Sequence, residues 1–376
     1  MTKYFEQAQK FAEQYISPSA IEFSHEAKFP EKVFEKLKEE GYLKLIIPEE
    51  QGGLGGDIHD LAEIIRAFAK ASPSVGLTYM MHNVSLNVVL NAAKDSLKSR
   101  IVKEVIEEGK VLALAYSESG SGVNFYYPET TAIREGDNWI INGTKSMVTS
   151  AEYASYYMVI AKTGEKREHT DNFLVSLGQE GSHFKMERWN GIGVLGNVSA
   201  PFYLENVSVP EEMRMGNEGS GMEQILTLVA PMFVAGLAAI YSGLNLAMVD
   251  EAIMHTTDRT FPDGSKLSEV DSIKRHISDI YNNAQASVGA TQNATLAARN
   301  GDEDAIVKIL SARIIAIENC IESGNKGMLI GGGRAYSQFR NFASYLADSL
   351  AGQVMAPSVD ILHQWVGSLL TGQPIP

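Results

Sequence analysis

The chain has 376 residues with 44% hydrophobic content, which is enough to bury a large core and, at this length, to divide it among more than one domain. Its formal net charge of -14 argues against nucleic-acid binding, because a phosphate backbone needs clustered cations. The single cysteine, Cys320, leaves no intrachain disulfide and no cysteine-based metal cluster, which indicates a reducing compartment. Met1 to Gln14 lack the apolar run of a signal peptide, so we expect a cytoplasmic protein.

Residues 1–110 carry the apolar spacing of amphipathic helices. The glycine-rich run 48–56 precedes a helix capped by Asp57, but it lacks the spacing of a phosphate loop, and Asp57 adds negative charge. This run is therefore predicted to be a structural loop between helices. The predicted helices cover 5–15, a stretch from Pro30 to Gly41, 57–70, 84–93 and 97–108.

From Val111 to about residue 215 the pattern changes to short apolar runs separated by turn residues, which predicts an antiparallel β-domain. Residues 112–122 run from an apolar segment into a Gly/Ser loop. Residues 139–145 are predicted to be a strand closed by an Asn142-Gly143 turn, with 146–150 as the returning strand. The two hydroxyl-rich segments are expected to face one another across a small sheet.

Helical patterns return in residues 216–376, where the stretch from Ile225 to Val249 carries no charge. Its length alone qualifies it as a membrane span, but acidic residues flank it on both sides without the expected cations. We therefore expect a buried helix and no membrane insertion. A helix that is uncharged on every face must be covered all round, which predicts a homotetramer or homodimer.

Two segments of the β-domain resemble the flavin-binding motifs of the acyl-CoA dehydrogenase superfamily. Residues 117–123 stand in place of its Thr-Glu-Pro-Gly-x-Gly-Ser loop, and residues 141–149 in place of its Ile-Asn-Gly-x-Lys-x-Trp-Ile-Thr strand. Residues 206–210 and 216–222 are similar to the strand and the turn that close the family's β-domain, so the likeness covers the whole chain. It implies an α+β fold with an N-terminal α-helical domain (1–110), a middle antiparallel β-domain (111–215) and a C-terminal helical bundle (216–376).

The resemblance also implies positions for the flavin ring. Ser117 would hydrogen-bond its pyrimidine side, Met147 would cover a ring face and Thr149 would reach N5, with Tyr116 and Val148 beside them. Met147 replaces an aromatic residue of the family.

For the phosphate half of FAD, the resemblance implies Arg259 as the pyrophosphate-binding arginine, and the Gly331-Gly332 segment and Ser358 as further contacts. Leu195 stands where the family has an arginine. The glycines are equally consistent with an ordinary helix end. FAD is the expected cofactor, with FMN or a reduced flavin as the alternative.

The family removes the proton α to a thioester carbonyl while the β-carbon sends a hydride to flavin N5, which requires a carboxylate base. Here the two positions that hold this glutamate in the family are Ala356 and Phe233, both apolar. Glu118, Glu218 and Glu223 lie near the site in sequence, but none is assigned, so the catalytic residue is unknown.

Because both positions of the family's catalytic glutamate are apolar here, three functions remain open. The first is α,β-dehydrogenation of an acyl thioester on CoA or a carrier protein, with an electron-accepting flavoprotein as partner. The second is a two-component monooxygenase of the same fold, which receives reduced flavin from a reductase and needs no carbon base. The third is a catalytically silent protein that binds flavin or an acyl thioester.

Overall fold

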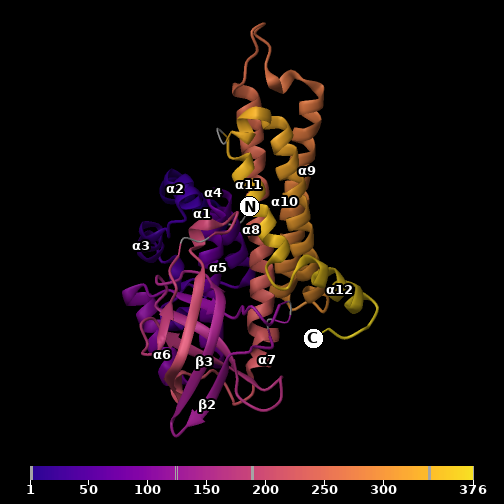
Figure 1. Cartoon of the computed structure of the whole chain (residues 1–376). Coiled ribbons are helices and arrows are strands. Elements are labelled where there is room, and N and C mark those ends of the chain that lie inside the picture. Colours follow the sequence, from indigo (N-terminus) through magenta and orange to yellow (C-terminus); the bar gives the residue numbers. More distant parts are fainter. Residues whose placement is uncertain (1–2, 123, 125, 188–189, 338–339, 376) are drawn as a thin grey trace.

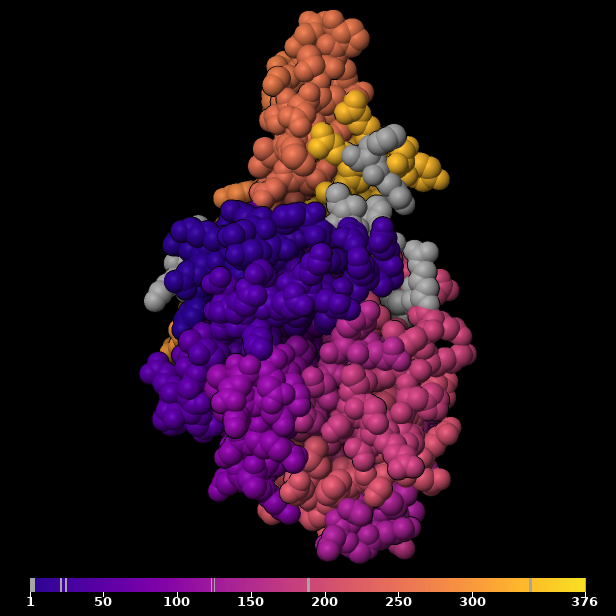
Figure 2. Space-filling view, turned by 90° about the vertical axis from the view of Figure 1, so that its left-hand side faces the viewer, coloured from indigo at the N-terminus to yellow at the C-terminus, as the bar shows by residue number. Residues whose placement is uncertain are grey.

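The computed structural model describes residues 3–122, 124, 126–187, 190–337 and 340–375, so Val123 of the predicted flavin loop lies outside the described part. Helices, a sheet and again helices follow one another along the chain, which confirms the predicted fold class (Figure 1). In Figure 2 the N-terminal helices (indigo) pack directly above the sheet region (magenta), and an orange projection from the C-terminal helices rises beyond both. The exact division at residues 110 and 215 stays a prediction.

The N-terminal segment is built from helices with sequence-encoded ends. Asp57 caps one of them by accepting hydrogen bonds from the backbone N–H groups of His59 (2.8 Å) and Asp60 (3.2 Å). Gly109 ends the segment in the left-handed conformation that favours glycine. The helices are α1 (Lys3–Phe11), α2 (Ala20–Glu26), α3 (Glu31–Glu39), α4 (Ile58–Ala71), α5 (Pro73–Ala92) and α6 (Asp95–Lys103).

One seven-stranded sheet forms the middle segment, in the order β1-β4-β2-β3-β7-β6, with β5 paired to β4. Most pairs are antiparallel as predicted, but β1 and β2 each run parallel to β4. The strands are β1 (Leu112–Ala115), β2 (Thr131–Glu135), β3 (Asn138–Val148), β4 (Tyr156–Lys162), β5 (Thr170–Ser176), β6 (Ser182–Phe184) and β7 (Ala200–Pro210).

The predicted Asn142-Gly143 hairpin is wrong. Strand β3 continues through both residues, and its pairing with β7 shifts register there, which is the signature of a β-bulge. Glycine is needed at position 143 for space, because a Cβ there would lie 2.3 Å from Thr130 Oγ1. The hairpin lies earlier in the sequence, where Gly136 and Asp137 form the turn that joins β2 to β3. As a result, residues 146–148, predicted to face the Ser117 segment from a separate returning strand, lie at the C-terminal end of the long strand β3.

The C-terminal segment is a bundle around the long apolar helix α8 (Ala230–Asp258), which a π-helical turn at Ile225–Val229 precedes. Gly243 lets α8 approach α4 closely, since a Cβ there would lie 2.4 Å from the Arg66 carbonyl oxygen. The remaining helices are α7 (Gly221–Gln224), α9 (Asp271–Asn300), α10 (Ala305–Tyr336), α11 (Phe342–Val354) and α12 (Val359–Leu370).

Helix α8 obtains its cover within the chain, from α4, α5, α9 and α10. In the described part of the chain, Gly221–Asp258 is long and apolar enough to cross a membrane, yet 67% of its most apolar window is buried, as is typical of a core helix. An oligomer is therefore not needed to cover the uncharged faces of α8. Ile253 and Met254 near its end remain exposed, and a homodimer or homotetramer stays a prediction.

Candidate functional site

The two segments predicted to hold the flavin ring lie side by side. Ser117 follows β1, and its carbonyl oxygen accepts a hydrogen bond (2.8 Å) from the N–H of Ser146 in β3. The next residues of β3 alternate, so that Met147 is 54% exposed while Val148 is buried, and Thr149 is buried just past the strand. Within the described part of the chain, the hydroxyls of Ser117 and Thr149 form no hydrogen bond. They are available to a ligand.

A buried ion pair fixes the loop that carries Ser117. Lys145 Nζ lies 2.5 Å from Glu118 Oε1 and also donates to the Ile160 carbonyl (2.6 Å). Glu118 accepts further hydrogen bonds from the Thr130 hydroxyl (2.6 Å) and the Glu129 N–H. Burial alone would raise the pKa of Glu118, but Lys145 and these donors hold it below its usual value. A carboxylate that is fully engaged in this way does not serve as a base.

Tyr116 is held in place from behind. Its hydroxyl donates to Asn172 Oδ1 (2.6 Å), and the Asn172 amide donates to Gln224 Oε1 (2.9 Å). Gln224 in turn donates to the Met215 carbonyl oxygen (2.9 Å). Burial raises the pKa of the Tyr116 hydroxyl. This chain of hydrogen bonds ties the end of β1 to the start of the C-terminal segment.

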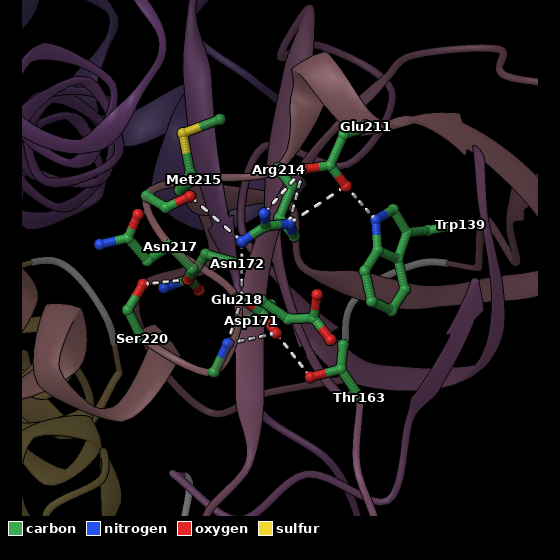
Figure 3. Close-up of polar contacts among 12 residues, drawn as sticks. Trp139, Thr163, Asp171, Asn172, Glu211, Arg214, Met215, Asn217, Glu218 and Ser220 are labelled. Atoms are coloured by element: carbon green, nitrogen blue, oxygen red, sulfur yellow. Dashed lines mark hydrogen bonds and ion pairs between the residues drawn. The ribbon is translucent and has the colours of Figure 1, made fainter. Parts of the chain in front are cut away.

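The same region contains a dense polar cluster around Arg214 (Figure 3). Its guanidinium donates to Asp171 (3.2 Å) on β5 and to Glu211 (2.7 Å), and Glu211 accepts from the indole N–H of Trp139 (2.6 Å). Thr163 donates to the other oxygen of Asp171. Every charge in this cluster has a partner, so we assign it to holding the turn between sheet and bundle.

One apolar cavity is lined by Tyr116, Ser117 and Met147 of the predicted ring residues, but not by Val148 or Thr149, and it also contains both positions where the family has its base. Ser117 and Met147 line it from the sheet, Phe233 from α8, and Ala356 from the segment after α11. The full lining is Met81, Leu114, Tyr116, Ser117, Tyr126, Met147, Leu226, Val229, Ala230, Phe233, Val234, Ala356, Pro357 and Trp365. Sequence reasoning missed Trp365, because nothing in the pattern of α12 places it at this site.

No carboxylate is among the described residues that line this cavity. Glu218 is half exposed and lies 3.8 Å from Arg134, and Glu223 is exposed on α7. Together with the engaged Glu118, these were the glutamates nearest the site in sequence. The polar groups of the described lining side chains are the hydroxyls of Tyr116, Ser117 and Tyr126 and the indole N–H of Trp365, so the cavity offers groups that can orient a ligand but no strong base.

The loop where Leu195 replaces the family's arginine packs next to Thr149. The Val194 N–H donates to Asp348 Oδ1 of α11 (2.6 Å), and the Ser150 N–H donates to the Asn197 carbonyl (2.9 Å). Burial raises the pKa of Asp348 to about 7. The loop thus joins sheet and bundle beside the cavity, although it contributes no cation.

The residues predicted for the cofactor phosphates lie elsewhere. Arg259 directly follows α8, whereas Phe233 of the cavity lies near the start of this helix. The 26 residues from Phe233 to Arg259 correspond to about 39 Å of helix, which is more than the width of a small domain. Gly331 and Gly332 sit in α10, which kinks at Gly332. Ser358 precedes α12 next to the cavity-lining Pro357. Within a single chain, Ser358 therefore lies close to the residues predicted to bind the flavin ring, whereas Arg259 lies far from them.

Cations gather where Arg259 lies. Burial lowers the pKa of His255, and the nearby Arg340, Arg334 and Arg259 lower it further. Arg340 pairs with Glu251 (3.7 Å) and Asp258 (3.5 Å), whereas Arg259 and Arg334 form no ion pair in the described part of the chain. The buried Nδ1 of His255 also lacks a partner there. This donor set fits phosphate oxygens, and the free hydroxyls near the cavity fit a flavin ring.

Replacing Arg259 by alanine is expected to weaken flavin retention about 10- to 100-fold, since a hydrogen bond to a charged group contributes about 1.5–3 kcal/mol. The ratio of flavin to protein absorbance after gel filtration measures this. Arg275→Ala is the matched control, because Arg275 is an exposed arginine of α9 without an ion pair among the described residues. Equal retention in both variants would contradict the role of Arg259.

Comparison with known proteins gives a consistent match along the chain. The family models of the acyl-CoA dehydrogenase N-terminal and middle domains match residues 2–109 and 113–207. The chain is 29% identical to a 3-(aryl)acrylate reductase of Clostridium sporogenes over 88% of this chain and 87% of that protein. It is 26% identical to a subunit of the caffeyl-CoA reductase–Etf complex of Acetobacterium woodii, over 88% and 87%.

Solved structures show the same fold. Butyryl-CoA dehydrogenase from Megasphaera elsdenii superposes with a TM-score of 0.92 at 21% identity, covering 99% of both chains.

Proposed function

Because the chain belongs to the acyl-CoA dehydrogenase family, we propose that it is a flavin-dependent oxidoreductase acting on the α,β carbon–carbon bond of an acyl thioester. We further propose that it works well as a reductase of α,β-unsaturated thioesters and poorly as a dehydrogenase of saturated ones. FAD is the proposed cofactor, and CoA or a carrier protein the proposed thioester carrier.

The observation that carries this direction is that the described residues lining the cavity include no carboxylate. Oxidation must remove a proton from a weakly acidic α-carbon, which demands a positioned base. Reduction instead places a hydride on the β-carbon and leaves negative charge on the thioester, and water or a hydroxyl protonates such an enolate readily. With Ala356 and Phe233 at the two base positions, oxidation has no acceptor for the α-proton, whereas a reduction driven by an external electron donor proceeds with a proton from solvent.

The residues of the site have distinct tasks in this proposal. A bound flavin supplies hydride chemistry at the β-carbon. The Ser117 and Thr149 hydroxyls orient the ring, and the Glu118–Lys145 pair keeps the Ser117 loop from shifting. Met147 and Phe233 form apolar walls of the cavity beside the reacting carbons, and the exposed Met147 leaves solvent access for the proton.

The distance between Arg259 and the cavity supports a shared cofactor site. The arginine cluster of one chain would hold the phosphates of a flavin whose ring lies in the cavity of a second copy. The names of the two reductases among the relatives support the direction, and the Etf complex of one supports an electron-transferring flavoprotein as the electron partner.

The test is a comparison of substrates on the purified, flavin-loaded protein without oxygen. We expect butyryl-CoA to perturb the flavin spectrum but bleach it slowly. Rapid bleaching would contradict the proposed direction. Oxygen-dependent product formation with an added reductase would favour the monooxygenase, and a spectrum unmoved by any thioester would favour the silent binder.

A further inference from the structure

A buried cation without a counter-ion lies directly behind the cavity wall. Arg313 of α10 is fully buried, and its Nη2 donates to the Met355 carbonyl oxygen (2.6 Å). Its Nε and Nη1 have no partner in the described part of the chain, and no carboxylate there lies within 4.0 Å. Met355 immediately precedes Ala356 and Pro357, which line the cavity.

Two other arginines are buried in the described residues, and each of them has a carboxylate partner. Arg66 lies 2.7 Å from Glu63, and Arg214 lies 3.2 Å from Asp171. Burial lowers the pKa of Arg313 to about 10, so the guanidinium still carries its charge at neutral pH. An isolated buried charge of this kind destabilises a fold, and an apolar residue of similar volume is often neutral or stabilising in its place. Packing alone therefore does not account for Arg313.

The position of the charge relates it to the ligand. The wall in front of it contains Ala356 and Pro357, with Phe233 and Trp365 also lining the cavity. Apolar surroundings screen a charge weakly, so its field extends into the cavity. A group that carries negative charge next to Ala356 is stabilised there, while a neutral hydrocarbon gains nothing.

Resting on the proposed function, we propose that Arg313 is a positioning residue that makes the Ala356 side of the cavity electropositive and so selects acyl thioesters whose carbonyl oxygen takes up negative charge. In the reduction, a bound reduced flavin would supply the hydride that forms the new bond at the β-carbon. The electron pair of the double bond moves through the α-carbon to the carbonyl oxygen. A proton from water then completes the α-carbon, and an external electron donor reduces the flavin again.

The experiment uses acetoacetyl-CoA as probe, because its enolate is an anion that absorbs in the ultraviolet. The pKa of the probe is measured by absorbance titration, free and bound to the flavin-loaded protein. We expect binding to lower the pKa of the probe in the wild type, and Arg313→Met to raise the pKa of the bound probe by about one unit, a tenfold change in acidity. Arg313→Lys, which keeps the charge, should retain most of the wild-type shift.

A purely structural role gives a different pattern. We expect the thermal midpoint of Arg313→Met to equal or exceed that of the wild type, because an unpaired buried charge is removed. A lower midpoint, or failure of this variant to fold, would overturn the proposal, as would an unchanged pKa of the bound probe. If the wild type retains flavin but does not bind the probe, the proposed function fails together with this inference; loss of the Arg313 effect alone leaves the proposed function intact.

Discussion

Replacing Ala356 by glutamate is expected to accelerate the anaerobic bleaching of the flavin by butyryl-CoA about 10²- to 10⁴-fold, the usual contribution of a positioned general base. Ala356 lines the cavity together with Phe233 and Ser117, so the new carboxylate would enter the space where the α-carbon is bound. The apolar lining would raise the pKa of this glutamate by desolvation, and Arg313 behind the wall would oppose the rise. Stopped-flow absorbance gives the rate.

The control for this gain is Ala356→Gln, which has the same size without a base. Thermodynamics of substrate and flavin are the same for both variants, so a difference between them reports the carboxylate. An equal gain in the glutamine variant, or none in the glutamate variant that still binds butyryl-CoA, would contradict the placement of Ala356 at the reacting carbons.

Replacing Lys145 by methionine is expected to lower the free energy of unfolding by about 3–5 kcal/mol, because it leaves the buried Glu118 carboxylate without its cation. Flavin retention should fall as well, since the pair fixes the Ser117 loop. Denaturant unfolding and gel filtration measure the two effects.

A double variant distinguishes loss of the Glu118–Lys145 ion pair from other effects of the Lys145 substitution. Glu118→Gln combined with Lys145→Met should recover part of the loss, and additive losses would contradict a coupled pair. The contribution of Glu118 also has a defined pH dependence. Its pKa is lowered in the folded chain, so this stability is present above the unfolded pKa of a glutamate and is lost as pH falls through the folded value.

The sequence predicted the fold class because its signals are local. The cap at Asp57, the left-handed Gly109 and the apolar runs of the sheet each act within a few residues. The Asn142-Gly143 error arose because the same dipeptide suits a turn and a bulge, and the choice depends on Thr130, which lies close to Gly143 only in three dimensions. Whether α8 is covered by its own chain likewise depends on distant helices.

The candidate site divides in the same way. Motif likeness pointed to Ser117, Met147, Phe233 and Ala356, and the fold brings all four to one cavity. The resemblance of the motifs could not reveal that Glu118 forms an ion pair with Lys145, because this pairing depends on how β3 packs beside the Glu118 loop. Arg313 lies within a helical pattern where arginine is unremarkable, so its lack of a counter-ion was invisible before the packing was known.

The most direct test of this account is a single turnover in the direction of reduction. Flavin-loaded wild-type protein is reduced with dithionite, freed of excess reductant and mixed without oxygen with one equivalent of cinnamoyl-CoA. We predict that the flavin absorbance returns in full and that the saturated thioester forms in equal amount. A flavin that stays reduced, in protein that demonstrably binds the thioester, would contradict the proposal that this cavity reduces α,β-unsaturated acyl groups.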